Sequence, residues 1–155
     1  MTQLSPGDPA PDFALPSTQG EQRLEDYAGE WLVLYFYPKD DTPGCTAQAC
    51  DLRDALPSLG ARVLGVSPDD LASHGAFEAK YSLPFPLASD PDHRVADAYG
   101  VWGEKTSFGR TYRGVIRSTF LIGPDGRVAE ALYGASAQGH AERVRERLSE
   151  LRAAR

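Results

Sequence analysis

The residues Trp31-Leu32-Val33-Leu34-Tyr35-Phe36-Tyr37 form the longest apolar run of the chain. The run is short, and its aromatic and β-branched side chains favour a strand over a helix. Because no polar residue interrupts it, both faces of this strand should be covered, as in a sheet with helices on each side. We therefore expect residues 31–37 to be the central strand of an α/β fold.

A helix is predicted shortly after this strand. Thr42 is a favourable N-cap residue, and Pro43 suits the first helical position. Leu52 and Leu56 lie four residues apart, so they would share one apolar face of the helix. Pro57 is expected to end it, because proline cannot donate a helical hydrogen bond. The sequence therefore predicts a helix between Pro43 and Pro57.

The rest of the chain continues the alternation of strands and helices. The predicted elements are helices over 70–81 and 93–99, a last helix with Ala141, Val144, Leu148 and Leu151 on one face, and strands over 62–66, 85–88, 113–122 and 128–133. Turn residues at 123–126 would join the last two strands as an antiparallel hairpin. Residues 12–15 would add a short N-terminal β extension. These elements predict a thioredoxin-like fold, in which helices flank a mixed β-sheet.

The composition fits one domain over residues 1–155. With 41% hydrophobic and 25% charged residues, the chain can bury a core without disulfides, which excludes disorder, coiled coil and collagen. A net charge of −6, without a Lys/Arg cluster before the last helix, argues against a nucleic-acid partner. Residues 1–15 lack the regions of a signal peptide, and no apolar run could span a membrane. We therefore expect a cytoplasmic protein with no membrane partner.

The two cysteines, Cys45 and Cys50, are too few for a disulfide framework and would need histidines to form a zinc site. His74, His93 and His140 have no ligand spacing, so we expect no metal and surface positions for these histidines. Cys45 would lie in the first turn of its helix, where free N–H groups and the helix dipole favour a thiolate. The cysteines are therefore either inert core thiols or redox groups.

Three segments together point to a known family. Residues 35–46 contain the pattern P-x-x-x-T-x-x-C, formed by Pro38, Thr42 and Cys45. This pattern and its surroundings resemble peroxiredoxins of the bacterioferritin comigratory protein or PrxQ subfamily. Residues 99–105 and 117–122 resemble the same subfamily in the same order, so the resemblance covers nearly the whole chain. It implies a single thioredoxin-like peroxiredoxin domain and a thiol peroxidase that needs no metal or organic cofactor.

The resemblance also implies a role for each site residue. Cys45 would be the peroxidatic cysteine, which attacks the terminal peroxide oxygen and becomes a sulfenic acid, and Cys50 would be the resolving cysteine. Thr42 would offer its hydroxyl to the peroxide, and Pro38 would shield the sulfenate. Arg117 would reach the thiolate and the peroxide from the hairpin strand, on the face that also carries Val115, Thr119 and Leu121.

The backbone N–H groups of Gly44 and Cys45 would complete the substrate pocket. Tyr99 and Trp102 are expected to pack, with their segment near the rim of the pocket. The substrates implied are hydrogen peroxide and small organic hydroperoxides. Thioredoxin or a similar dithiol reductant would reduce the Cys45–Cys50 disulfide, and a monomer is expected.

Two alternatives use the same fold. A general thiol–disulfide oxidoreductase would favour a C-x-x-C pair, which the spacing of Cys45 and Cys50 does not provide. A metal-delivery module would use both cysteines and a histidine. In a regular helix the two cysteine Cα atoms would lie roughly 8.6 Å apart. A disulfide needs less than about 7 Å, so the first turns would have to unwind in each catalytic cycle.

Overall fold

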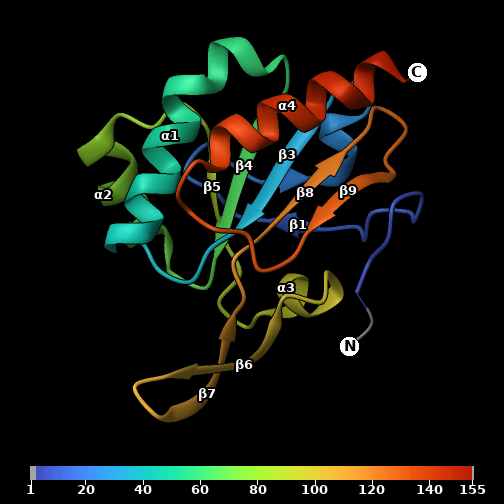
Figure 1. Cartoon of the computed structure of the whole chain (residues 1–155). Coiled ribbons are helices and arrows are strands. Elements are labelled where there is room, and N and C mark those ends of the chain that lie inside the picture. The colour runs from blue at the N-terminus through green and yellow to red at the C-terminus, as the bar shows by residue number, and fades with distance from the viewer. Residues whose placement is uncertain (1–2, 155) are drawn as a thin grey trace.

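A five-stranded mixed sheet forms the centre of the structure, a computed structural model that describes residues 3–154 (Figure 1). Its strand order is β5-β4-β3-β8-β9. The apolar run supplies β3 (Leu32–Phe36), which pairs parallel with β4 (Arg62–Ser67) and antiparallel with β8 (Ser118–Ile122). The outer strands are β5 (Leu87–Ser89), parallel to β4, and β9 (Val128–Leu132), antiparallel to β8. The predicted mixed sheet and its central strand are confirmed, while β5 starts two residues later than expected.

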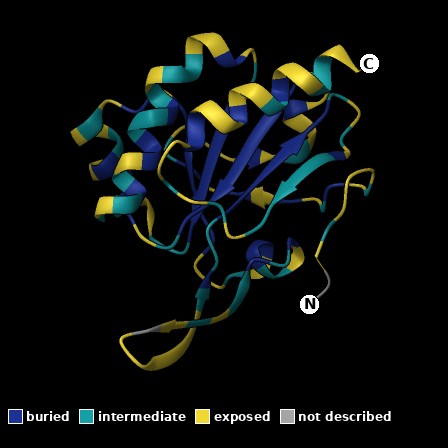
Figure 2. Cartoon of the chain, viewed as in Figure 1, coloured by how far each residue is buried: buried dark blue, intermediate teal, exposed yellow. Residues whose placement is uncertain are grey.

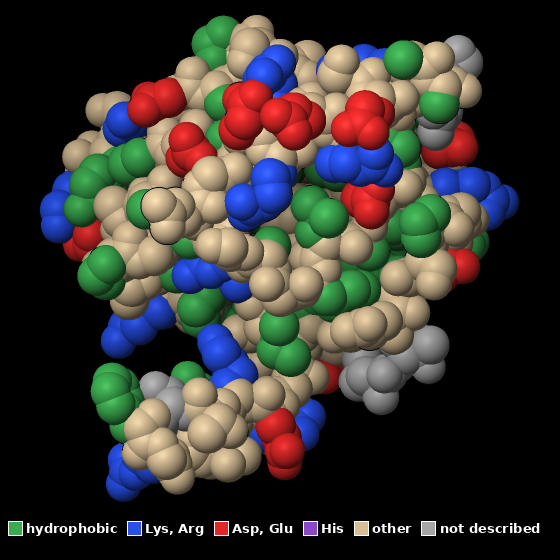
Figure 3. All heavy atoms as spheres, in the orientation of Figure 1, with side chains coloured by type: hydrophobic (Ala, Val, Ile, Leu, Met, Phe, Trp, Pro, Cys, Tyr) green, Lys and Arg blue, Asp and Glu red, His purple; other side chains and the backbone are tan. Residues whose placement is uncertain are grey.

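Helices and the N-terminal segment cover the two faces of the sheet, so that β3, β5 and β8 are buried along their whole length, whereas the edge strand β9 is mostly half-buried (Figure 2). The helices are α1 (Pro43–Leu59), α2 (Leu71–Tyr81), α3 (Arg94–Ala98) and α4 (His140–Ala153). One core cluster joins buried residues of α1, α2 and α4 to the sheet. The other cluster joins α3 and the N-terminal segment to the opposite face. Charged side chains of both signs line the solvent side of α4 (Figure 3).

Two small sheets accompany the central one. The N-terminal β extension consists of β1 (Ala14–Leu15) and β2 (Gln22–Arg23), followed by the 3-10 helix η1 (Leu24–Tyr27). A second hairpin, β6 (Trp102–Ser107) with β7 (Arg110–Val115), projects from the body (Figure 1). The sequence analysis did not predict this second hairpin.

The predicted strand over residues 113–122 is wrong as a single element. The chain leaves the projecting hairpin at Val115 and enters the central sheet at Ser118. Between them, the backbone N–H of Ile116 donates to the carbonyl of Val101 at 2.7 Å. Val115 and Leu121 consequently pack in the two different core clusters and do not share a face. The alternation of residue types continues through this link, so the sequence pattern does not reveal the change of sheet.

Pro57 does not end the cysteine helix, contrary to the prediction. Helix α1 includes Pro57 and continues to Leu59, where Gly60 adopts a left-handed conformation with φ 63°. The Arg152 guanidinium of α4 donates to the carbonyl oxygens of Leu59 and Gly60, which satisfies groups that a helix end leaves unpaired. Tertiary contacts with α4 therefore stabilise the helix end beyond the proline.

Two of the three histidines are not on the surface, which corrects another expectation. The side chains of His74 and His140 are fully buried, and His93 stacks on Trp102 with a centroid distance of 3.9 Å. Their hydrogen-bond partners come from distant segments, Asp40 for His74 and Thr119 for His140. No helix in the described part of the chain is long and apolar enough to span a membrane.

Candidate active site

The site lies where the chain passes from the carboxyl end of β3 into α1. Thr42 takes the N-cap position with extended backbone angles, and Pro43 opens the helix as predicted. The Thr42 side chain does not cap the helix, however, because its hydroxyl donates to the carbonyl of Lys39 at 3.0 Å. The N-terminal amides of α1 are thus not occupied by this hydroxyl. They remain available to stabilise negative charge at the first turn.

Cys45 is 1% exposed and lies in the first turn of α1. Its sulfur accepts a hydrogen bond from Nη2 of Arg117 at 3.2 Å, across a sequence separation of 72 residues. Gly44 permits this approach, since a Cβ on Gly44 would lie 3.2 Å from the same guanidinium nitrogen. The guanidinium and the helix N-terminus thus both place positive potential at the Cys45 sulfur.

Gln48 is a site residue that the sequence analysis missed. It is fully buried, and its Oε1 accepts a hydrogen bond from Nη1 of Arg117. The same guanidinium therefore bonds Cys45 and Gln48 through different nitrogens. Because residues three apart in a helix share a face, the spacing of Cys45 and Gln48 could have revealed the pair. Gln48 fixes the guanidinium plane that meets the sulfur.

Lys105 of β6 adds a second cation to this region. Its ammonium donates to the carbonyl of Val115 at 2.8 Å, on the strand that leads to Arg117. Burial and then the positive charge of Arg117 lower the pKa of Lys105, while charge at Cys45 acts in the opposite direction. Arg117, in the link between β7 and β8, and Lys105, on β6, therefore both contribute positive potential near the Cys45 sulfur.

Tyr35 of β3 packs in the same core cluster as Cys45. Its ring lies across Gly65, where a Cβ would come within 2.9 Å of the tyrosine hydroxyl. Burial, followed by the proximity of Cys45, raises the pKa of Tyr35 well above its usual value, so the hydroxyl keeps its proton. The Tyr35 hydroxyl and Nε2 of Gln48 have no hydrogen-bond partner within residues 3–154. The floor of the site thus holds polar groups that lack partners of their own.

The structure brings five predicted site residues into one region. It also places both cysteines in the same helix, α1. Pro38, Thr42, Gly44 and Cys45 lie on one continuous connection, and Arg117 reaches it from the link between β7 and β8. Cys50 follows in α1, where it is half-buried, and both cysteines are free thiols.

Tyr99 and Trp102 pack, as expected. The buried Tyr99 hydroxyl donates to the carbonyl of Pro11 at 2.7 Å, and Trp102 stacks on His93.

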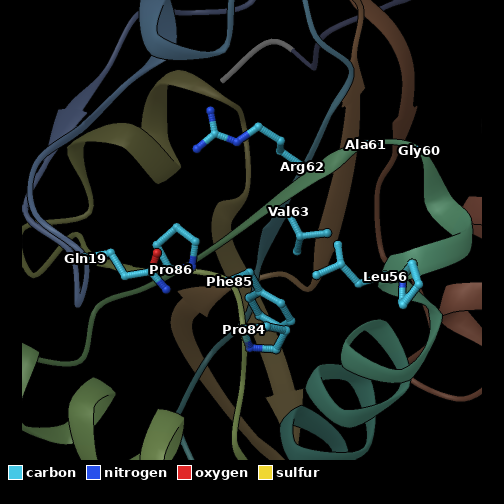
Figure 4. Close-up of a pocket in the computed structure, with 10 residues that line it drawn as sticks. Gln19, Leu56, Gly60, Ala61, Arg62, Val63, Pro84, Phe85 and Pro86 are labelled. Carbon is cyan, nitrogen blue, oxygen red and sulfur yellow. The ribbon is translucent and has the colours of Figure 1, made fainter.

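A separate cavity of about 370 Å³ lies at the opposite end of α1 (Figure 4). Leu56 and Gly60 border it on the helix side, and Pro84 and Phe85 border it on the other. None of the predicted site residues lines this cavity. Within residues 3–154, no group of three or more His, Cys, Asp or Glu side chains is arranged to hold a metal ion.

Comparisons with known proteins agree on one family. A model of the AhpC/TSA family matches residues 6–131. A putative peroxiredoxin of Mycobacterium tuberculosis is 47% identical over 152 residues, which cover 96% of this chain and 97% of the relative. Peroxiredoxin Bcp of Bacillus subtilis is 44% identical over 149 residues, covering 94% of this chain and 95% of the relative.

A solved structure shows the same fold. The bacterioferritin comigratory protein of Xanthomonas campestris is 42% identical, with a TM-score of 0.84, over 89% of this chain and 90% of that one. The match in sequence spans the cysteine helix, the hairpin and the central sheet together. The chain therefore belongs to the AhpC/TSA family and, within it, to the Bcp/PrxQ peroxiredoxins, which are thiol peroxidases.

Proposed function

We propose that this chain reduces hydrogen peroxide and alkyl hydroperoxides through a Cys45 sulfenic acid and a Cys45–Cys50 disulfide. The observation that carries the proposal is the hydrogen bond from Arg117 to the buried Cys45 sulfur at a helix N-terminus. Alkyl peroxide reduction is an activity of the Xanthomonas campestris relative, which supports the same class of substrate here.

In the first step the Cys45 thiolate attacks the terminal oxygen of the hydroperoxide. The O–O bond breaks, the sulfur gains that oxygen as a sulfenic acid, and the remaining alkoxide takes up a proton and leaves as an alcohol or as water. Arg117 and the amides of Gly44 and Cys45 stabilise the charge that develops on the leaving oxygen, and Thr42 joins them when its hydroxyl turns from the Lys39 carbonyl to the peroxide. Pro38 shields the sulfenate from solvent.

In the second step the Cys50 thiolate attacks the Cys45 sulfenic sulfur, the S–O bond breaks as the disulfide forms, and the departing hydroxide takes up a proton and leaves as water. A dithiol of the thioredoxin type then reduces the disulfide and is itself oxidised. We further propose that the protein works as a monomer in the cytoplasm. Light scattering of the reduced and oxidised forms checks the oligomeric state.

The test uses peroxide-dependent NADPH consumption with thioredoxin and thioredoxin reductase, on the wild type and both cysteine variants. Cys45→Ser should abolish turnover. Cys50→Ser should reduce one equivalent of peroxide and leave a trappable sulfenic acid on Cys45. The two variants control for each other, because each removes one sulfur from the same helix. Turnover by Cys45→Ser, or a sulfenate trapped on Cys50, would reverse the two roles.

A further inference from the structure

A buried ion-pair cluster lies beside the catalytic connection, and the chemistry above does not use it. Its centre is Asp40, which is 7% exposed. The Asp40 carboxylate receives hydrogen bonds from Ser73 Oγ at 2.7 Å and from the hydroxyl of Tyr37. Nδ1 of His74 lies 2.6 Å from the same carboxylate. Three side chains from β3's end and α2 thus converge on one buried carboxylate two residues before Thr42.

Both ring nitrogens of His74 face acceptors. Nε2 lies 2.9 Å from the carbonyl oxygen of Ala88, which can only accept, so Nε2 carries a proton. At 2.6 Å, Nδ1 and the Asp40 oxygen must also have a proton between them. Burial by itself would raise the pKa of Asp40, but hydrogen bonds from His74, Tyr37 and Ser73 lower it on balance. A short, fully buried hydrogen bond thus joins Nδ1 of His74 to the Asp40 carboxylate, while Nε2 anchors the ring to Ala88.

The segment that this pair holds is residues 38–42. The backbone N–H of Asp40 donates to Asp69 at 2.6 Å, which ties the segment to the residues before α2. Asp41 has a positive φ of 57°, an unfavourable conformation for a residue with a side chain. Its carboxylate contacts Lys80 at 2.8 Å, but that ion pair is exposed. Exposed pairs hold geometry weakly, so the buried pair restrains this segment more than the Lys80 contact does.

We propose that His74 is a positioning residue for the peroxidase reaction, acting through Asp40 to hold residues 38–42, with Pro38 and Thr42, in the reactive arrangement. The inference rests on the proposed function, because Thr42 and Pro38 matter only if Cys45 attacks a peroxide. His74 itself does not touch the substrate. The hydrogen bond at Nδ1 positions Asp40, whereas the bond from Nε2 to Ala88 only anchors the ring.

Two substitutions separate these two nitrogens. In His74→Asn, the amide nitrogen can occupy the place of Nδ1 and still donate to Asp40. In His74→Gln, the longer side chain places its amide nitrogen near Nε2 and can still donate to Ala88, but it leaves Asp40 without this donor. Lys80→Gln is the exposed control, since it removes the charged partner of Asp41 from the same helix and leaves the Tyr81 hydroxyl bonded to Asp41.

The measurement is the second-order rate constant for oxidation of Cys45 by hydrogen peroxide in a single turnover, on variants shown to be folded by circular dichroism. His74→Gln should lose at least about tenfold, because small misplacements of catalytic groups have effects of that size. His74→Asn and Lys80→Gln should stay within about twofold of the wild type. Equal losses in His74→Asn and His74→Gln, no loss in either, or an equal loss in Lys80→Gln would overturn the proposal.

Amide hydrogen exchange of residues 39–42 gives a second readout that does not depend on activity. We expect faster exchange in His74→Gln and wild-type exchange in His74→Asn. If the wild type reduced no peroxide, the proposed function would fail, and this exchange would still test the restraint. Unchanged exchange in His74→Gln would then overturn the restraint itself.

Discussion

The first turns of α1 lie between two flanks of opposite charge. On one side, Arg117 donates to the Cys45 sulfur and to Gln48. On the other side, the Asp40 carboxylate is bonded to His74 of α2, and the Asp40 N–H donates to Asp69 just before α2. The cationic flank places its charge beside the Cys45 sulfur, whereas the carboxylate of the acidic flank is paired with the buried His74 ring. If Cys45 reacts as proposed, the first arrangement changes the energy of the reacting sulfur, and the second fixes positions.

The two buried histidines show the same contrast. His74 faces a carboxylate, while His140 faces the Thr119 hydroxyl through Nε2 at 2.7 Å. Nδ1 of His140 has no hydrogen-bond partner within residues 3–154. Burial, followed by the charges of Arg143 and Arg117, lowers the pKa of His140 to about 4. His140 is thus buried beside a hydroxyl and near two arginines, whereas His74 is buried against a carboxylate.

The largest effect should come from the cationic flank. Arg117→Lys keeps the charge but loses the planar fork that serves Cys45 and Gln48 together. Removing one well-placed donor of this kind costs roughly 100- to 1000-fold in rate. Stopped-flow measurement of Cys45 oxidation by peroxide checks this expectation. Kinetics near those of the wild type would mean that charge alone matters on this flank and would weaken the comparison.

The lowered pKa of His140 should make the free energy of unfolding depend on pH. Above pH 6.5 this group is neutral in the folded and the unfolded chain. Between pH 6.5 and about 4 the unfolded chain binds a proton that the folded chain does not, so stability falls as the pH falls. The shift corresponds to about 3 kcal/mol at full extent.

His140→Gln keeps a donor near Nε2 for Thr119 but cannot titrate. Urea unfolding at several pH values should show that the variant loses less stability between pH 6.5 and about 4 than the wild type does. Parallel curves for the two proteins would show that His140 does not carry this dependence.

The smallest expected effect is a change in amide exchange when the cysteines are oxidised, which shows which side of the site loses its structure. In a regular helix, Cys45 and Cys50 are too far apart for a disulfide, so the proposed disulfide requires the first turns to unwind away from Arg117. We expect amide exchange over residues 43–54 to be at least about tenfold faster in the oxidised protein. Exchange of α2, which carries His74, should change little. Equal protection of residues 43–54 in both redox states, with the disulfide confirmed by mass, would contradict this expectation.

Much of the fold follows from local patterns. The uninterrupted apolar run at residues 31–37 predicts a strand covered on both faces, and Thr42 and Pro43 predict a helix start. Both are confirmed. The Leu52 face and the last helix follow from 3.6-residue periodicity, which depends only on neighbours along the chain. The spacing of Pro38, Thr42 and Cys45 pointed to the peroxiredoxin family by resemblance, and the family is confirmed.

Contacts between distant segments decided the rest. Arg152 supports the end of α1 beyond Pro57, and the link around Arg117 changes sheets where the sequence alternates without a break. Only the hydrogen bond from Arg117 identifies Gln48 as a residue of the site. Only the contacts with Asp40 and Ala88 explain why the His74 side chain can be buried. The sequence by itself determined the central strand β3 and the start of helix α1, and so the place of Cys45 in the first helical turn, because these depend on steric preference and periodicity. Only the tertiary structure decided which charges meet, because hydrogen bonds join residues that the chain separates.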